Sequence, residues 1–436
     1  MWMQTEPLDQ HLSNDVVSLF RLIGQMANDQ GYRVYLVGGF VRDLFLQRPS
    51  QEADIVVEGD GPSLAALFGR MTGWKITVHK RFLTATAVAP DEGSSLRRLD
   101  FVTARQEVYP RAGSLPVVRP ARLTDDLLRR DFSINALALS LNQDDFGCLL
   151  DPVGGWQDLR RRLIRVLHDK SFRDDPTRML RAVRYEQRFG FRMDRKTVRL
   201  MKEAIRQHFL ATVSRDRIKA ELLKVFQEDR PGKILLRMKD LGLLKEVAPE
   251  LRVTARTIAT VNLFLKRFQD YQKKGAGDLK DRTSPLMALL LPDEGAAVSF
   301  AQRFQFSERW LRNVRGLIQV AREAVLNQPS DFVFALRSLP PEMALAVSVL
   351  RRDVSPRQWR RYFFDWRLVR PDVTGEELTR WGLKGKEIQE ALTVALRLKL
   401  DFKADPSLQR AFALLGRQPN RGATPSEGGN DGRDNS

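Results

Sequence analysis

The chain has 436 residues, of which 43% are hydrophobic, and its 72 Lys and Arg residues against 54 Asp and Glu residues give a formal net charge of +18. This length exceeds what one hydrophobic core supports, so two to four structural units are expected, and the excess of positive charge favours a polyanionic partner, although charge alone fits a merely solubilising surface equally well. The single cysteine, Cys148, excludes an internal disulfide and a cysteine-based zinc site.

The sequence lacks the apolar segments that membrane insertion or secretion requires. The longest uninterrupted apolar run, near residues 286–291, ends at Pro292 and is too short to cross a bilayer. Residues 1–10 are polar and acidic and lack the apolar centre of a signal peptide. We therefore expect a cytoplasmic protein with no membrane partner.

Residues 1–150 have the pattern of a small mixed sheet with helices on one side. Apolar residues at helical spacing predict a first helix over residues 8–28. Strands and short helices then alternate. The predicted strands cover residues 33–37, 54–57, 75–78, 83–89 and 98–103, and the predicted helices between them cover 41–47 and 62–72.

Beyond residue 159 the strand pattern stops, and long amphipathic segments predict an all-helical region. The expected helices cover residues 175–189, 195–208, 214–227, 231–242, 255–274, 284–291, 307–325, 341–350, 356–367 and 385–398. Residues 417–436 are rich in Gly, Asn, Ser and Pro and are predicted to be disordered.

A glycine pair, Gly38 and Gly39, stands between the first predicted strand and a short helix. Glycines at such a turn let backbone N–H groups approach a phosphate, and a helix N-terminus adds positive potential. Glu52 and Asp54 share one face of the next strand, where two carboxylates repel unless a cation lies between them. With only four His in the chain, oxygen ligands favour Mg²⁺. A phosphate site beside a metal site suggests nucleotidyl transfer.

Four ordered motifs resemble the class II tRNA nucleotidyltransferase and bacterial poly(A) polymerase family. They lie at residues 36–43 with 52–57, 129–136, 151–159 and 174–181. The resemblance is clear over residues 32–250 and continues to about residue 400. It implies an α+β fold, with a nucleotidyltransferase head of small mixed sheet and helices over residues 1–150, followed by an all-α neck over 151–225, a body over 226–325 and an RNA-binding tail over 326–416.

The resemblance implies a catalytic metal site formed by Glu52, Asp54 and Asp100, the last on an alternating strand. Two Mg²⁺ ions are expected there, one lowering the pKa of an RNA 3′-hydroxyl and the other holding the triphosphate. An isolated strand Asp is more often a solvated residue, but the glycine pair upstream favours the metal site. The family has Asp where this chain has Glu52, so Glu52 either reaches the ion through a local shift, slows the enzyme, or marks lost activity. We expect an active enzyme.

The resemblance also implies a nucleotide-binding set drawn from the first, second and fourth motifs. Arg42 is expected to line the triphosphate site, with a structural partnership to Asp43 or Asp54 as the alternative. Asp131 and Asn135, four residues apart, would share a helix face near the ribose and phosphates. The set is Gly38, Gly39, Arg42, Arg129, Arg130, Asp131, Asn135, Asp175, Arg178 and Arg181.

Asp175 and Arg178 are the predicted base-reading residues. Three residues apart on a helix, they would be neighbours and would offer an acceptor and a fork of donors to the Watson–Crick edge of a base. The protein would then select the nucleotide without a template. The alternative is a helix-surface salt bridge, which stabilises little. Arg181, one turn further, would support Asp175 or contact phosphate.

Two arginine groups are RNA-binding candidates. Arg160 and Arg161 lie beside the hinge motif, and Arg357, Arg360 and Arg361 alternate with aromatic residues in the tail. Helical spacing predicts that the aromatic residues are core, which leaves the arginines for RNA phosphates.

These observations predict transfer of AMP, CMP or both from ATP or CTP to the 3′ end of tRNA, with release of pyrophosphate. A poly(A) polymerase acting on other RNAs shares the same motifs and stays open. A non-catalytic RNA-binding protein with a degenerate metal site also stays open, because of Glu52.

Overall fold

The computed structural model describes residues 2–3, 12–48, 50–91 and 93–402, and it separates into two compact units, Met1–Pro249 and Glu250–Ser436. The finer limits predicted at residues 150, 225 and 325 stay predictions. The segment predicted to be disordered, residues 417–436, lies outside the described residues. Among the described helices, none combines the length and apolar character that crossing a membrane requires.

An eight-stranded sheet forms the base of the first unit, in the order β1-β10-β9-β2-β3-β6-β5-β4. Its neighbours pair antiparallel except β3 and β6, which are parallel. This parallel register aligns Asp54 with Asp100, so both carboxylates project from the same face of the sheet. The strands are β1 Trp2–Met3, β2 Arg33–Val37, β3 Glu52–Glu58, β4 Lys75–His79, β5 Thr84–Val88, β6 Arg98–Thr103, β9 Ala138–Ser140 and β10 Leu149–Leu150.

The five predicted strands are all present, and the strand predicted at 98–103 has the bounds of β6. Sequence periodicity missed the short strands β1, β9 and β10, and it also missed a separate hairpin of β7, Arg105–Val108, and β8, Val117–Pro120. Strands of two to four residues are too short for alternation to define.

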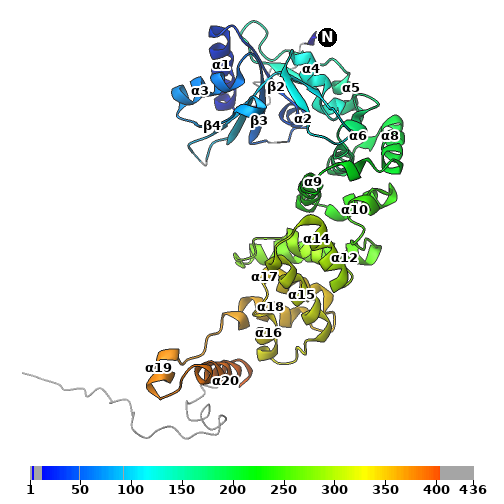
Figure 1. Ribbon diagram of the computed structural model, residues 1–436. Coiled ribbons are helices and arrows are strands. Elements are labelled where there is room, and N and C mark those ends of the chain that lie inside the picture. The colour runs from blue at the N-terminus through cyan, green and yellow to red at the C-terminus, as the bar shows by residue number, and fades with distance from the viewer. Residues whose placement is uncertain (1, 4–11, 49, 92, 403–436) are drawn as a thin grey trace, which may run out of the picture. The chain divides into compact units, whose positions relative to one another are not determined.

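Helices α1, Asn14–Asp29, and α3, Gly61–Thr72, pack on one face of this sheet (Figure 1). The opposite face carries the carboxylates and is covered in part by the short helix α4, Leu123–Leu128, whose Leu127 packs against Val37 and Val56. The prediction of helices on a single side therefore omitted α4.

The rest of the first unit is mostly helical, as predicted. One correction is a two-residue parallel pair between β11, Leu163–Ile164, and β12, Arg192–Met193, inside the region expected to be all-helical. Such a pair arises from tertiary contact between two connections and leaves no periodic signal. The helices are α2 Gly39–Phe45, α5 Gly155–Arg160, α6 Ser171–Asp174, α7 Arg178–Phe189, α8 Arg195–Arg206, α9 Arg215–Gln227, α10 Pro231–Asp240 and α11 Leu243–Val247.

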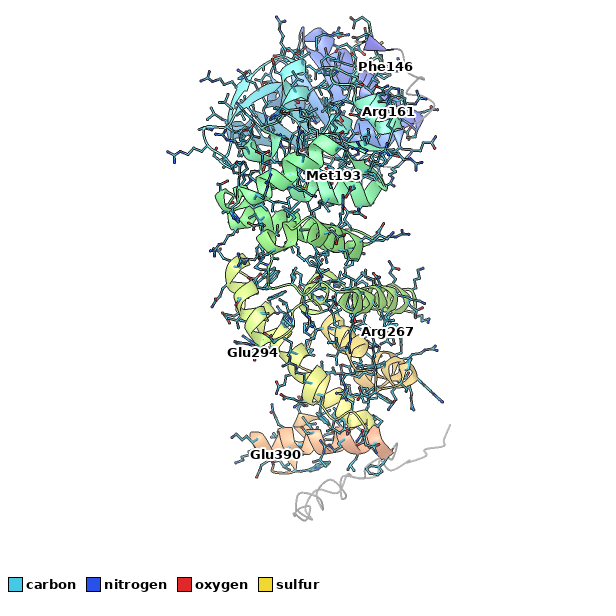
Figure 2. All side chains as sticks on the ribbon, turned by 90° about the vertical axis from the view of Figure 1, so that its right-hand side faces the viewer. Phe146, Arg161, Met193, Arg267, Glu294 and Glu390 are labelled. Atoms are coloured by element: carbon cyan, nitrogen blue, oxygen red, sulfur yellow. The ribbon has the colours of Figure 1, made fainter. Side chains whose placement is uncertain are left out.

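The second unit is helical throughout its described residues. Trp359 is fully buried and packs edge-on against Phe332 with ring centroids 5.3 Å apart. Tyr362, Phe363 and Trp366 are also buried, which confirms these aromatic residues as core, whereas Phe364 is half-buried. Arg267, labelled in Figure 2, donates to the Ser348 carbonyl oxygen at 2.8 Å and ties two of these helices together. The helices are α12 Ala255–Lys273, α13 Thr283–Ala288, α14 Glu294–Phe304, α15 Glu308–Glu323, α16 Pro329–Leu336, α17 Pro341–Leu350, α18 Pro356–Phe364, α19 Gly375–Arg380 and α20 Lys386–Phe402.

The close approach of α1 to the sheet generates a stability prediction. A Cβ at Gly24 would lie 1.8 Å from the Leu141 carbonyl oxygen, and backbone cannot yield as a flexible side chain would. We expect Gly24→Ala to destabilise the protein by about 2 kcal/mol or more in urea unfolding, since overpacking typically costs ~1–3 kcal/mol. Gln25→Ala, at an exposed position of the same helix, is the matched control and should stay within ~0.5 kcal/mol of wild type. Equal effects of the two changes would contradict this packing.

Candidate active site

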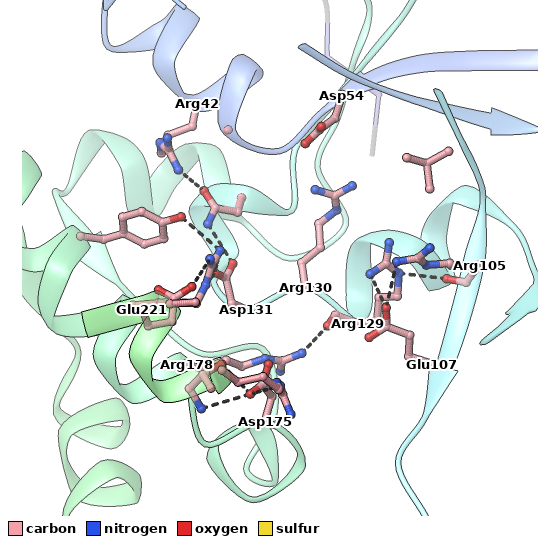
Figure 3. Close-up of a pocket in the computed structure, with 18 of the residues that line it drawn as sticks. Arg42, Asp54, Arg105, Glu107, Arg129, Arg130, Asp131, Asp175, Arg178 and Glu221 are labelled. Atoms are coloured by element: carbon pink, nitrogen blue, oxygen red, sulfur yellow. Dashed lines mark hydrogen bonds and ion pairs between the residues drawn. The ribbon is translucent and has the colours of Figure 1, made fainter. Parts of the chain in front are cut away.

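A cavity of about 650 Å³ opens in the first unit on the face of the sheet that carries the carboxylates. It gathers residues from β3, the α4 region, α7 and α9 (Figure 3). Three predicted site residues, Gly38, Glu52 and Asp100, do not line it. The predicted residues that do are Gly39, Arg42, Asp54, Arg129, Arg130, Asp131, Asn135, Asp175, Arg178 and Arg181.

The three predicted metal ligands lie on the paired strands β3 and β6. Asp54 is open to the cavity, but the protein atoms around it raise the pKa of its carboxyl group, an effect that Arg130 opposes and Asp100 reinforces. Asp100 accepts hydrogen bonds from the Thr86 hydroxyl at 2.6 Å and from Arg98 at 3.1 Å. Within the described residues, no group of three His, Cys, Asp or Glu side chains is assembled for a metal ion.

The two adjacent arginines of the second motif have different surroundings. The guanidinium group of Arg129 donates hydrogen bonds to Asp126 at 2.5 Å, to Glu107 at 2.7 Å and to the Arg105 carbonyl oxygen. Arg130 also pairs with Asp126, at 3.0 Å, but its Nε has no partner within the described residues, and Figure 3 shows its guanidinium pointing toward Asp54. Arg130 thus keeps donors for a ligand, whereas Arg129 is held by the protein.

Asp126 is the fully buried anchor of these two arginines. Burial by itself would raise the pKa of Asp126, but the adjacent guanidinium groups of Arg130 and Arg129 outweigh it and lower the pKa. The sequence analysis missed this residue, although its spacing of three and four residues from the arginines was a usable signal.

Gly38 has a left-handed backbone, with φ of 70°. Its N–H donates to the Leu137 carbonyl oxygen at 3.2 Å, so that amide is already bonded within the protein. A Cβ at Gly38 would lie 2.5 Å from an Arg130 guanidinium nitrogen. Glycine here therefore makes room for Arg130 beside Asp54, and Gly39 is the member of the pair that lines the cavity.

A buried network joins the second motif to α7. Asp131 accepts from Arg181 at 2.8 Å and from the Asn135 amide at 2.8 Å, and Asn135 accepts from Arg42 at 2.6 Å. The predicted Asp131–Asn135 contact exists, but not on an α-helix, because Asp131 precedes a 3-10 turn, Ser133–Asn135. Arg42 also pairs with Asp43 at 2.8 Å, so it both lines the cavity and has the structural partner named as the alternative.

The predicted helical pairing of Asp175 with Arg178 is wrong. Asp175 has an extended backbone and lies before α7, because the following Pro176 disfavours a helical conformation at the residue it follows. The carboxylate of Asp175 accepts instead from Thr177 and, at 2.8 Å, from Arg217. Both predicted base-reading residues still line the cavity.

Arg178 is buried and fixed in place. It donates to the Ser171 hydroxyl at 2.9 Å and to the Arg129 carbonyl oxygen at 2.7 Å (Figure 3). Its orientation thus depends on the backbone of the second motif, 49 residues earlier in the chain.

Seven charged or polar residues that the sequence analysis did not assign to the site also line the cavity. The spacing of four residues between Arg217 and Glu221 on α9 was an available signal, whereas the residues of the β7 hairpin carry none, since its register is set by tertiary pairing. The missed residues are Arg105, Glu107, Tyr109, Thr177, Tyr185, Arg217 and Glu221.

The lining has seven arginines against five carboxylates, so the cavity suits a polyanion held beside Asp54. The predicted RNA-binding residues lie elsewhere. Arg160 and Arg161 are exposed in the first unit (Arg161 is labelled in Figure 2), and Arg357, Arg360 and Arg361 are exposed on α18 of the second unit.

Comparisons with known proteins agree with this geometry. Residues 34–165 match a family model described as the poly A polymerase head domain, and residues 190–254 match one described as the probable RNA and SrmB-binding site of polymerase A. An A-adding tRNA nucleotidyltransferase of Geobacter sulfurreducens is 34% identical over 412 residues, which are 91% of this chain and 46% of that protein. The chain spans about half the length of the first curated relatives it matches.

Solved structures match over nearly the whole chain. A Thermotoga maritima CCA-adding enzyme in complex with tRNA is 30% identical, with a TM-score of 0.72, over 94% of this chain and 97% of that chain. A CCA-adding enzyme in complex with ATP is 28% identical, with a TM-score of 0.77, over 95% of this chain and 99% of that chain.

The Asp131 network generates a prediction for stability against pH. Burial alone would raise the pKa of Asp131, but Arg181, the Asn135 amide and Arg178 outweigh it and lower the pKa from 3.8 to about 2. A depressed folded-state pKa contributes stability above the unfolded-state pKa, and this is lost as pH falls from about 4 towards 2. At ~1.4 kcal/mol per unit, the loss is about 2 kcal/mol.

We therefore expect Asp131→Asn to be less stable than wild type at neutral pH, and the difference to shrink as the solution is acidified. Urea unfolding of both proteins between about pH 7 and pH 3 measures the gap. A gap that stays constant over this range would contradict the assignment of a charged Asp131.

Proposed function

Because the chain belongs to the class II tRNA nucleotidyltransferase and bacterial poly(A) polymerase family, we propose that it transfers a nucleotide, foremost AMP, from its triphosphate to the 3′-hydroxyl of tRNA and releases pyrophosphate. The observation that carries this proposal is the position of the aligned carboxylates Asp54 and Asp100 beside a cavity with an excess of arginines. Such a cavity can hold a triphosphate where charge develops in an in-line displacement.

Different residues of the cavity would bind the phosphates and the base of the nucleotide. Arg130, whose Nε is unbonded within the described residues, is placed to hold phosphate oxygens near Asp54. Arg178 and Asp175 present donors and acceptors to a base from fixed positions, so recognition needs little reorganisation on binding. AMP is the foremost candidate because the relative from Geobacter sulfurreducens, which matches 91% of this chain, is named as A-adding.

The carboxylates fit a divalent cation. Asp54 and Asp100 are hard oxygen donors on one face of adjacent strands, with Glu52 two residues before Asp54 on that face. Mg²⁺ held by these residues would supply Lewis-acid activation of the hydroxyl nucleophile and stabilise the leaving pyrophosphate. In the structure Arg98 bonds Asp100 and faces Glu52 across the strand pair, so it partly neutralises this group of acids.

Two further parts belong to the proposal. The exposed residues Arg160, Arg161, Arg357, Arg360 and Arg361 would contact RNA phosphates, and a cytoplasmic location would suit tRNA maturation. An extension experiment distinguishes this proposal from two alternatives. A poly(A) polymerase would extend unrelated RNA, and a non-catalytic protein would bind tRNA without extending it.

Single-turnover extension of tRNA transcripts tests the function. The transcripts end before CCA, after the first C, or after CC, and each receives ATP or CTP separately. We expect one AMP to be added to the transcript that ends in CC. Stepwise C and A addition would identify a full CCA-adding enzyme, long A tracts on unrelated RNA a poly(A) polymerase, and no extension of any substrate would contradict the proposal.

Glu52 generates the sharpest variant test. If its charge serves the metal site, Glu52→Gln should lower the single-turnover rate at least ~100-fold, whereas Glu52→Asp, which keeps the charge, should stay within ~10-fold of wild type. Binding of tRNA should be unchanged in both variants, because the acidic group is not a phosphate ligand. A fully active Glu52→Gln enzyme would remove Glu52 from the site, and a large gain in Glu52→Asp would show that the native site is impaired.

A further inference from the structure

Asp100, one of the carboxylates proposed to hold the divalent cation, already has a positive partner supplied by the chain. The Nη2 atom of Arg98 lies 3.1 Å from one Asp100 carboxylate oxygen and 3.0 Å from the other, and the Thr86 hydroxyl donates to the first at 2.6 Å. Arg98 and Asp100 are two residues apart on β6, so their side chains share one face of the sheet. The guanidinium group therefore contacts both oxygens that an Asp100-bound cation would use.

The strand pairing also puts Arg98 beside the other acids of the proposed cation site. In the parallel register of β3 and β6, Arg98 is the partner of Glu52, and Asp100 is the partner of Asp54. Burial raises the pKa of the Asp54 carboxyl group, Asp100 adds to this effect, and Arg98 opposes it. Arg98 thus supplies part of the positive charge that neighbouring carboxylates need to stay ionised.

Arg98 can leave Asp100 at little cost. Its side chain is 46% exposed, whereas the side chain of Arg130 is 15% exposed and pairs with the fully buried Asp126. Ion pairs at exposed positions stabilise little, so solvent can replace Asp100 as the partner of Arg98. A divalent cation takes carboxylate oxygens into its own coordination shell and is repelled by an adjacent guanidinium group. Cation binding at Asp100 and the Arg98 ion pair are therefore in competition.

We propose that Arg98 is a positioning residue of the cation site, which holds the Asp100 carboxylate in the metal-free protein and competes with the divalent cation for it. Arg98 thereby sets the Mg²⁺ concentration at which the site is filled. This inference rests on the proposed function, because it requires that Asp54 and Asp100 bind the cation. Arg98 acts on the reaction only through Asp100.

The test measures Mn²⁺ binding to the full chain by EPR spectroscopy of the free ion, since Mn²⁺ accepts the same oxygen ligands as Mg²⁺. We expect Arg98→Gln to bind Mn²⁺ roughly 10-fold more tightly than wild type, because a guanidinium group and a divalent cation a few ångströms apart repel by this order even in water. Arg98→Lys keeps the charge, and Arg97→Gln removes the same charge from the neighbouring exposed position as the matched control. Both should stay within ~3-fold of wild type.

Urea unfolding provides a second readout. A variant that binds the cation more tightly gains more stability from it, so added Mg²⁺ should raise the unfolding midpoint further in Arg98→Gln than in wild type. An Mn²⁺ affinity that is equal or weaker in Arg98→Gln would overturn the inference. An equal gain in Arg98→Lys or in Arg97→Gln would overturn it as well, because neither change removes the charge beside Asp100.

Asp100→Asn separates the inference from the proposed function. This change should weaken Mn²⁺ binding at least ~10-fold, since a neutral amide is a poorer ligand for a hard cation than a carboxylate. An affinity that Asp100→Asn leaves unchanged would refute the proposed cation site itself. If Asp100→Asn weakens binding but Arg98→Gln does not strengthen it, the cation site stands and the role of Arg98 is refuted.

Discussion

The ion pair between the buried Asp131 and the half-buried Arg181 is the contact on which the arrangement of the candidate site depends. It joins the turn of the second motif to helix α7, and Asn135 and Arg42 extend it to the first motif. Without Arg181, the buried Asp131 carboxylate would lose its main counter-ion, which would destabilise the fold. The pair therefore fixes α7, and with it Arg178, relative to the sheet that carries Asp54.

The two arginines next to this pair, Arg129 and Arg130, differ in how many of their donors are already bonded within the protein. Arg129 is saturated by Asp126, Glu107 and a carbonyl oxygen, and its own carbonyl oxygen orients Arg178. Arg130 has donors left and lies where only a glycine at position 38 leaves room. Two adjacent arginines thus differ, since Arg129 is bonded within the protein and Arg130 faces the cavity beside Asp54.

Helix α7 and helix α9 both contribute side chains to the cavity. Glu221 on α9 pairs with Arg181 at 3.7 Å and with Arg184 at 3.4 Å, both on α7, so one carboxylate ties the two helices together.

The sequence by itself determined the order of the main elements, the α+β character of the first part, the helical second part and half of the residues that line the cavity. Its success has a physical reason, since periodicity and motif spacing are local properties that survive folding. Glu52 and Asp54 were placed on one face in this way, because alternate residues of a strand share a face.

The tertiary structure alone decided how those residues are arranged. Pro176 moved Asp175 off the helix on which spacing had placed it, and the β7 hairpin brought Glu107 to Arg129 through a pairing with no sequence period. The register of β3 against β6 set Asp54 beside Asp100. Cavities form between segments far apart in the chain, and their walls depend on long-range packing that no local pattern encodes.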